Sequence, residues 1–179
     1  MKKSLLLAIV GFATISLMQG ADTPTQPAAG AAAPEFTLAT SDGSQVSLKD
    51  FKGKWVVLYF YPKDMTSGCT IEAHNFQRDL AQYDKTGAVI LGVSVDSAES
   101  HAKFAGKFGL PFPLLADDGG AVAKAYGALW SLGPIKFAKR HTFIVTPDGN
   151  IARIYRDVKP EEHSRQVMAD VQALQQASR

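Results

Sequence analysis

The chain has 179 residues, which is enough for one domain with a proper core and too short for two catalytic domains. Its composition, 46% hydrophobic and 20% charged, excludes disordered and collagen-like proteins. Once Lys2 and Lys3 are set aside as part of a removable segment, basic and acidic residues balance. A neutral body gives no electrostatic reason to expect nucleic acid as a partner.

The first twenty residues have the pattern of an export signal. Lys2 and Lys3 precede an apolar run over residues 5–13, and smaller, more polar residues follow up to Gly20. We therefore expect residues 1–20 to be a signal peptide and the mature protein to be periplasmic, with no stable membrane association after cleavage. The run is short for a membrane span, but the imperfect cleavage site leaves an uncleaved anchor as the alternative.

Residues 21–33 are rich in Ala and Pro and lack periodic apolar positions, which predicts a linker. One folded domain is expected over residues 34–179, with alternating strand and helix patterns. Residues 55–61 form a continuous apolar run, typical of a strand buried on both faces, that stops at Pro62. Apolar residues then recur at helical spacing from Ala73 to Tyr83, and Gly87 ends this predicted helix.

The next predicted strand covers residues 88–95. Asp96 and Glu99 predict a capping pair for a helix that carries Phe104 and Phe108. A shorter strand at 113–116 and a helix at 121–126 follow.

The chain closes with a predicted hairpin and a last helix. Strands at 142–145 and 151–155 flank turn-forming residues at 147–150, and Pro160 opens a helix with apolar residues on one side. Strand and helix alternation that ends in an antiparallel hairpin implies an α/β fold with a mixed central sheet and helices on both faces.

Cys69 is the only cysteine of the chain. The chain therefore cannot form an internal disulfide, a zinc site of four cysteines or of two cysteines and two histidines, or a Cys-x-x-Cys redox pair. Cys69 lies seven residues past Pro62 and just ahead of the amphipathic helix, where open α/β sheets bind ligands. The positive end of the helix favours the nucleophilic thiolate. The alternative is a buried, inert cysteine, but the small and polar flanks, which include Asp64 and Ser67, do not resemble a core.

Residues 62–72 read PKDMTSGCTIE and match the pattern Pro-x-x-x-Thr-x-x-Cys, which resembles the peroxiredoxin signature. The run that starts at Tyr61 is similar to the bacterioferritin comigratory protein, or peroxiredoxin Q, subfamily. Segments 33–38, 92–96 and 140–145 resemble that subfamily in order and spacing, so the resemblance covers residues 33–179. It implies a thioredoxin fold with peroxiredoxin additions and no metal or organic cofactor.

The resemblance also implies roles for residues near the cysteine. Cys69 would be the peroxidatic nucleophile, and the Thr66 hydroxyl would accept a hydrogen bond from the peroxide or donate one to the sulfur. Backbone N–H groups of Gly68 and Cys69 would face the two peroxide oxygens. Pro62, which has no N–H, would shield the thiolate from water and from further oxidation, in addition to ending its strand.

Two charged residues complete the implied site. The family counterpart of Arg140 stands just before the penultimate strand, where a guanidinium favours the thiolate and donates to the peroxide. Without the resemblance, Arg140 would be a solvated surface charge. Glu72 would pair with Arg140 and position it, and an exposed glutamate that stabilises the helix end is an equally simple alternative.

The sequence departs from the family pattern at two positions. Many members carry proline where Ser67 stands, and disulfide-forming members place a resolving cysteine at the position of His74. The chain therefore resembles a one-Cys peroxiredoxin, in which an external thiol resolves the sulfenic acid of Cys69. That reductant would be a thioredoxin-like or glutaredoxin-like protein or a low-molecular-weight thiol. His74 would be a surface histidine or a proton donor, and the four histidines have no metal-ligand spacing.

The function predicted from the sequence is a thiol-dependent peroxidase of antioxidant defence that reduces hydrogen peroxide and organic hydroperoxides, as a monomer or weak dimer. The N-terminal half is also similar to exported disulfide reductases, but these need Cys-x-x-Cys, and Glu72 stands at the fourth position. A Cys–His hydrolase lacks a histidine that the sequence places beside Cys69. The remaining alternative is a non-catalytic redox-sensing or binding module of thioredoxin fold.

Overall fold

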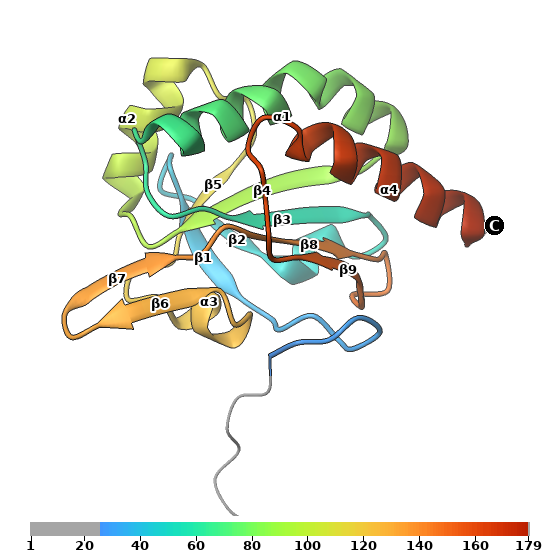
Figure 1. Ribbon diagram of the computed structural model, residues 1–179, viewed down its shortest axis with the longest axis horizontal. Coiled ribbons are helices and arrows are strands. Elements are labelled where there is room, and N and C mark those ends of the chain that lie inside the picture. The colour runs from blue at the N-terminus through green and yellow to red at the C-terminus, as the bar shows by residue number, and fades with distance from the viewer. Residues whose placement is uncertain (1–25, 179) are drawn as a thin grey trace, which may run out of the picture.

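A seven-stranded mixed sheet runs through the middle of the molecule (Figure 1). The computed structural model describes residues 26–178. The strand order is β2-β1-β5-β4-β3-β8-β9, in which β3, β4 and β5 are parallel neighbours and the other pairs are antiparallel. The strands of this sheet are β1 (Thr37–Thr40), β2 (Gln45–Ser47), β3 (Val56–Phe60), β4 (Val89–Ser94), β5 (Leu114–Ala116), β8 (His141–Val145) and β9 (Ile151–Tyr155).

Helices cover both faces of this sheet. In Figure 1, α1, α2 and α4 lie on one face, and the short α3 lies on the other. The helices are α1 (Ser67–Thr86), α2 (Ala98–Phe108), α3 (Ala121–Ala125) and α4 (His163–Ala177), with a 3-10 turn η1 (Leu48–Phe51). The predicted α/β fold with a mixed central sheet and helices on both faces is confirmed by this strand order and by the placement of the helices.

Strand β3 is central because its side chains suit burial on both faces. All five of its residues are buried, and successive side chains point to opposite faces. Tyr59 belongs to the core beneath α1, α2 and α4, and Phe60 belongs to the core on the side of α3.

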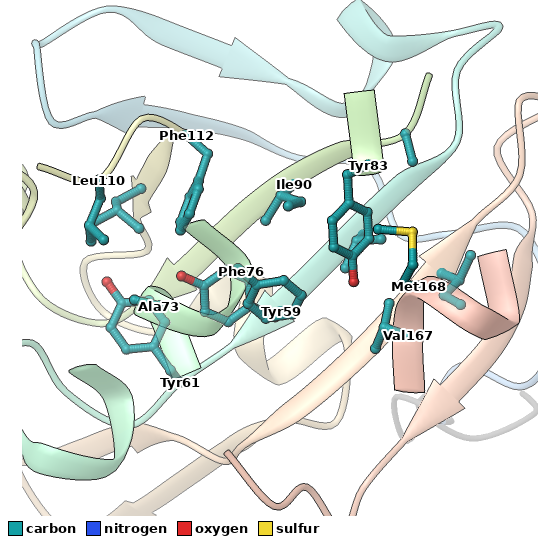
Figure 2. Close-up of a cluster of buried hydrophobic side chains, with 14 of the residues drawn as sticks. Tyr59, Tyr61, Ala73, Phe76, Tyr83, Ile90, Leu110, Phe112, Val167 and Met168 are labelled. Carbon is teal, nitrogen blue, oxygen red and sulfur yellow. The ribbon is translucent and has the colours of Figure 1, made fainter. Parts of the chain in front are cut away.

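The first of these cores joins α1 to the sheet and to α4 (Figure 2). Phe76 on α1 is fully buried, and its ring stacks on Tyr59 with centroids 4.8 Å apart. The Tyr83 hydroxyl donates to the Ser164 carbonyl at 2.7 Å, which ties α1 to the start of α4. These contacts hold α1, and with it Cys69 near its start, in a fixed place over β3.

The predicted strands and helices agree with the structure in order and type. Gly87 ends α1 with φ at 68°, a left-handed conformation that glycine adopts without strain. The predicted capping pair of Asp96 and Glu99 is wrong, because the cap of α2 is Ser97, whose hydroxyl accepts from the Ser100 N–H at 3.2 Å.

Two hairpins are absent from the sequence prediction. The hairpin of β1 and β2 is short and half-exposed. The second hairpin, β6 (Leu129–Leu132) with β7 (Ile135–Ala138), extends away from the main sheet (Figure 1). Leu132 and Ile135 near its tip are exposed, so the alternation of buried and solvated residues that identifies strands is missing there.

Residues ahead of Pro34 also contact the domain. The Gly30 N–H donates to the Ile151 carbonyl at 2.7 Å, and Ala33 is buried. The folded part of the chain thus begins before the expected start at Pro34. The predicted signal peptide, residues 1–20, and the first part of the predicted linker lie outside the described residues. Between residues 26 and 178, no helix is long and apolar enough to cross a membrane.

Phe76→Ala should destabilise the domain by about 3–5 kcal/mol, because it leaves a cavity beneath α1. Urea denaturation followed by circular dichroism measures the change. Ile71→Ala on the same helix is the control, since Ile71 is 40% exposed, and its effect should stay below about 1 kcal/mol. A similarly small loss for Phe76→Ala would contradict the packing described above.

Candidate active site

Cys69 is the third residue of α1, just past the carboxyl end of β3. Thr66 is the N-cap of the helix, and the Thr70 N–H makes the first bond of the helix, to the Thr66 carbonyl at 2.9 Å. The N–H groups of Ser67, Gly68 and Cys69 therefore have no acceptor within the helix. Cys69 is 2% exposed, whereas Gly68 is half-buried and Ser67 is exposed, so the positive end of the helix dipole acts on a buried sulfur next to a first turn that solvent reaches.

Arg140 reaches this cysteine through the pairing of two strands. Strand β8 runs antiparallel to β3, and its first residue, His141, stands opposite Phe60, the last residue of β3. The residue before β8 is therefore brought to the start of α1. Arg140 Nη2 lies 3.4 Å from Cys69 Sγ, across a separation of 71 residues in sequence.

Gly68 leaves room for this guanidinium. A Cβ atom at position 68 would lie 3.3 Å from Arg140 Nη2, which is tighter than most Cβ contacts in proteins. A side chain at this position would require the guanidinium to shift by a few tenths of an ångström.

Glu72 lies one turn further along α1 and holds the same arginine. Arg140 Nη1 donates to Glu72 Oε2, and the glutamate is fully buried, so it is not the exposed first-turn residue of the simpler alternative. Burial raises the pKa of Glu72 to about 7, against the opposing effect of the Arg140 charge. Glu72 Oε1 has no hydrogen-bond partner within residues 26–178. Glu72 is thus paired on one oxygen only and can titrate near neutral pH.

Thr66 and Pro62 lie in the loop that leads to Cys69. The Thr66 hydroxyl donates to the Lys63 carbonyl at 2.9 Å. Its only proton is engaged there, so this hydroxyl offers lone pairs rather than a donor. Of the two roles expected for Thr66, accepting a hydrogen bond fits this geometry and donating to the sulfur does not. Pro62 is half-buried and lies two residues after Phe60, the last residue of β3.

His74 lies on the surface of α1. It is exposed, and its ring makes a T-shaped contact with Phe108 of α2, with centroids 5.3 Å apart. The other three histidines, His101, His141 and His163, are buried. In the described part of the chain, no three His, Cys, Asp or Glu side chains are grouped as metal ligands.

Asp64, which the sequence pattern indicated only as a polar flank of Cys69, is a buried residue with a distant partner. Asp64 is 5% exposed, and its carboxylate contacts the buried His101 at 2.9 Å. Because 37 residues separate the two, no local pattern predicts their contact.

Known proteins resemble this chain over most of its length. The family described as AhpC/TSA matches residues 29–154. Peroxiredoxin Bcp of Bacillus subtilis is 44% identical over 140 residues, which cover 75% of this chain and 88% of that protein. Peroxiredoxin Q of Triticum aestivum, a chloroplast protein, is 43% identical over 147 residues, which cover 81% of this chain and 67% of that protein.

Solved structures give the same picture. Peroxiredoxin Q of Xanthomonas campestris has a TM-score of 0.73 with 39% identity, and the match covers 77% of this chain and 90% of that one. Peroxidoxin BcpB of Mycobacterium tuberculosis has a TM-score of 0.79 with 29% identity, and the match covers 83% of this chain and 98% of that one.

Replacing Glu72 with Gln should remove a pH dependence of folding. Since burial raises the pKa of Glu72 from 4.5 to about 7, the folded chain binds a proton between these values that the unfolded chain does not. The stability from this proton is fully present below pH 4.5 and is lost as the pH rises through 7. Urea denaturation from pH 4 to 8 should show the free energy of unfolding falling by up to about 3 kcal/mol relative to Glu72→Gln.

The exposed Glu99 supplies the matched control for this experiment. Glu99→Gln should keep the pH slope of the native chain. Identical slopes for the native chain and Glu72→Gln would contradict the raised pKa.

Proposed function

This chain belongs to the AhpC/TSA family and is a peroxiredoxin oxidoreductase related to the Bcp and Q types, and we propose that it reduces peroxides through Cys69 alone with an external thiol as reductant. Its substrates in this proposal are hydrogen peroxide and organic hydroperoxides, and its role is antioxidant defence. The observation that carries the proposal is the Arg140 guanidinium 3.4 Å from the sulfur of the only cysteine.

In the first step, the Cys69 thiolate attacks one peroxide oxygen, and the O–O bond breaks. The sulfur loses two electrons and becomes a sulfenic acid, while the other oxygen takes a proton from solvent, equivalent to the one the thiol lost on ionising, and leaves as water or an alcohol. Negative charge therefore moves from sulfur to the leaving oxygen, and fixed donors along that path lower the barrier. Arg140 and the free N–H groups of the first turn of α1 are such donors, and Glu72 holds Arg140 in place.

In the second step, an external thiol attacks the sulfenic acid of Cys69. A mixed disulfide forms and water leaves, and a second thiol then releases Cys69 as a thiol and the reductant as a disulfide. The support is the cysteine count, because a chain with one cysteine has no internal thiol to take this role. His74 is exposed on α1, five residues after Cys69, and an imidazole cannot act as the second thiol.

Export to the periplasm is part of the proposal. The support is the sequence of residues 1–20, in which two lysines precede an apolar run. The family match begins only at residue 29. N-terminal sequencing of the protein from fractionated cells tests this proposal, and an intact Met1 in the membrane fraction would favour the anchor instead.

Single-turnover kinetics test the peroxidase proposal. Reduced protein should consume one equivalent of hydrogen peroxide per chain, orders of magnitude faster than the unfolded chain, and a sulfenic-acid reagent should trap one group per chain. Added thiol should restore turnover, with two thiols oxidised per peroxide. Cys69→Ser should do none of this. A rate no faster than that of the unfolded chain would favour the redox-sensing module.

Thr66→Val should lower the rate constant for peroxide by about 10²-fold, because it keeps the shape of the side chain and deletes the oxygen that accepts from the peroxide. Thr66→Ser retains a hydroxyl that can donate to the Lys63 carbonyl, so it should stay within a few-fold of the native rate. The same stopped-flow assay measures both variants. Equal rates for Thr66→Val and Thr66→Ser would remove the hydroxyl from the mechanism.

A further inference from the structure

We propose that Asp64 and His101 form a buried positioning pair that holds residues 62–66, the loop before Cys69, in the conformation that binds peroxide. The proposal deepens the proposed peroxidase function and rests on it. Both residues act through the loop, so they are positioning residues rather than catalytic ones.

The loop contains a strained residue that its own contacts do not explain. Met65 has φ at 62°, and it is the only non-glycine residue in the left-handed region between residues 26 and 178. This conformation is strained for a residue with a Cβ, and it persists only where the surroundings fix it. The Met65 side chain is 44% exposed, so its own packing holds it weakly. The fixing contacts therefore come from the neighbouring residues.

Asp64, directly before Met65, supplies such contacts. Its Oδ1 accepts from the Tyr61 hydroxyl at 2.7 Å. Its Oδ2 accepts from the Ser100 hydroxyl at 2.7 Å and from His101 Nδ1 at 2.9 Å. One carboxylate thus joins the end of β3 to the first turn of α2.

The backbone of Asp64 is anchored as well. Its N–H donates to Asp96 Oδ2 at 2.9 Å, and the same oxygen accepts from the Ser94 hydroxyl at 2.7 Å. Ser94 is the last residue of β4. On the other side of Met65, the Thr66 hydroxyl closes the loop onto the Lys63 carbonyl. Met65 therefore lies between two residues that are held in place, Asp64 and Thr66, and Thr66 is the residue that faces the peroxide in the proposed mechanism.

The pair carries charge in a place without water. The side chains of Asp64 and His101 are 2% and 0% exposed. Burial alone would raise the pKa of Asp64, but the bonds from His101, Ser100 and Tyr61 hold it below its usual value. An ionised carboxylate only accepts, so Nδ1 of His101 carries the proton in their bond. Removing either partner leaves a buried polar group without its hydrogen bond. This group then shifts toward solvent, and residues 62–66 change conformation with it.

Such a pair adds little net stability compared with apolar residues of similar size. Its main consequence is a specific conformation of the loop. Two reactions of Cys69 separate this role from a general structural one: reaction with peroxide needs Thr66 and the loop in place, whereas alkylation by iodoacetamide needs only the thiolate and access to it.

The test compares His101→Leu with His101→Asn in the full chain. His101→Leu removes the donor to Asp64 and should lower the rate constant for hydrogen peroxide at least tenfold, while alkylation stays equal or becomes faster. In His101→Asn, the amide nitrogen of the new side chain can take the place of Nδ1, so this variant should keep the peroxide rate within about threefold. Urea denaturation defines conditions in which each variant is folded.

Asp64→Asn provides the second variant if His101→Leu does not fold. Its amide still accepts from Tyr61 but can no longer accept from both Ser100 and His101, so the same split between the two rates is expected. Asp118→Asn, at an exposed aspartate, is the matched control and should change neither rate.

Two results would overturn the positioning pair: a parallel fall of both rates in His101→Leu or Asp64→Asn, and equal peroxide rates for His101→Leu and His101→Asn. A native chain that reacts with peroxide no faster than unfolded chain would instead reject the peroxidase function itself.

Discussion

The antiparallel pairing of β8 with β3 is the constraint on which the site depends. It brings the residue before β8 to the carboxyl end of β3, where α1 begins, and so places a guanidinium on the sulfur of Cys69. Other parts of the fold keep Arg140 and Cys69 in contact. The aromatic core under α1 fixes the helix over the sheet, and Gly68 keeps the space that Arg140 occupies.

Two pairs, each of a buried acidic residue with a distant basic residue, lie on either side of Cys69 along the chain. Glu72 pairs with Arg140 after the cysteine, and Asp64 pairs with His101 before it. Buried charges are costly, and their partners must meet them in one geometry. In our proposals, the first pair orients the donor that touches the reacting atoms, and the second fixes the loop that presents Thr66. The site is thus rigid through polar contacts as well as through its apolar core.

Elements with strong local patterns were predictable. The continuous apolar run of β3 predicts a strand that is buried on both faces. The apolar residues of α1 recur at helical spacing up to Gly87, which predicts a helix that is buried on one face. The hairpins of β1 with β2 and of β6 with β7 have no such pattern in the sequence, because their strands are short or largely exposed. The cap at Ser97 was missed because Asp96, the stronger acidic candidate, is engaged by Asp64 and Ser94.

The sequence by itself determined the chemistry available to this protein: one cysteine, at a helix start after a buried strand, within a peroxiredoxin-like motif. It also determined that no second thiol exists in the chain. Only the tertiary structure decided which distant groups meet that cysteine. Arg140 is 71 residues away and His101 is 37 residues from Asp64, and such contacts depend on strand register and helix packing rather than on local spacing. The direction of the Thr66 hydroxyl was likewise decided by the folded loop, because the Lys63 carbonyl that takes its proton is brought within reach only there.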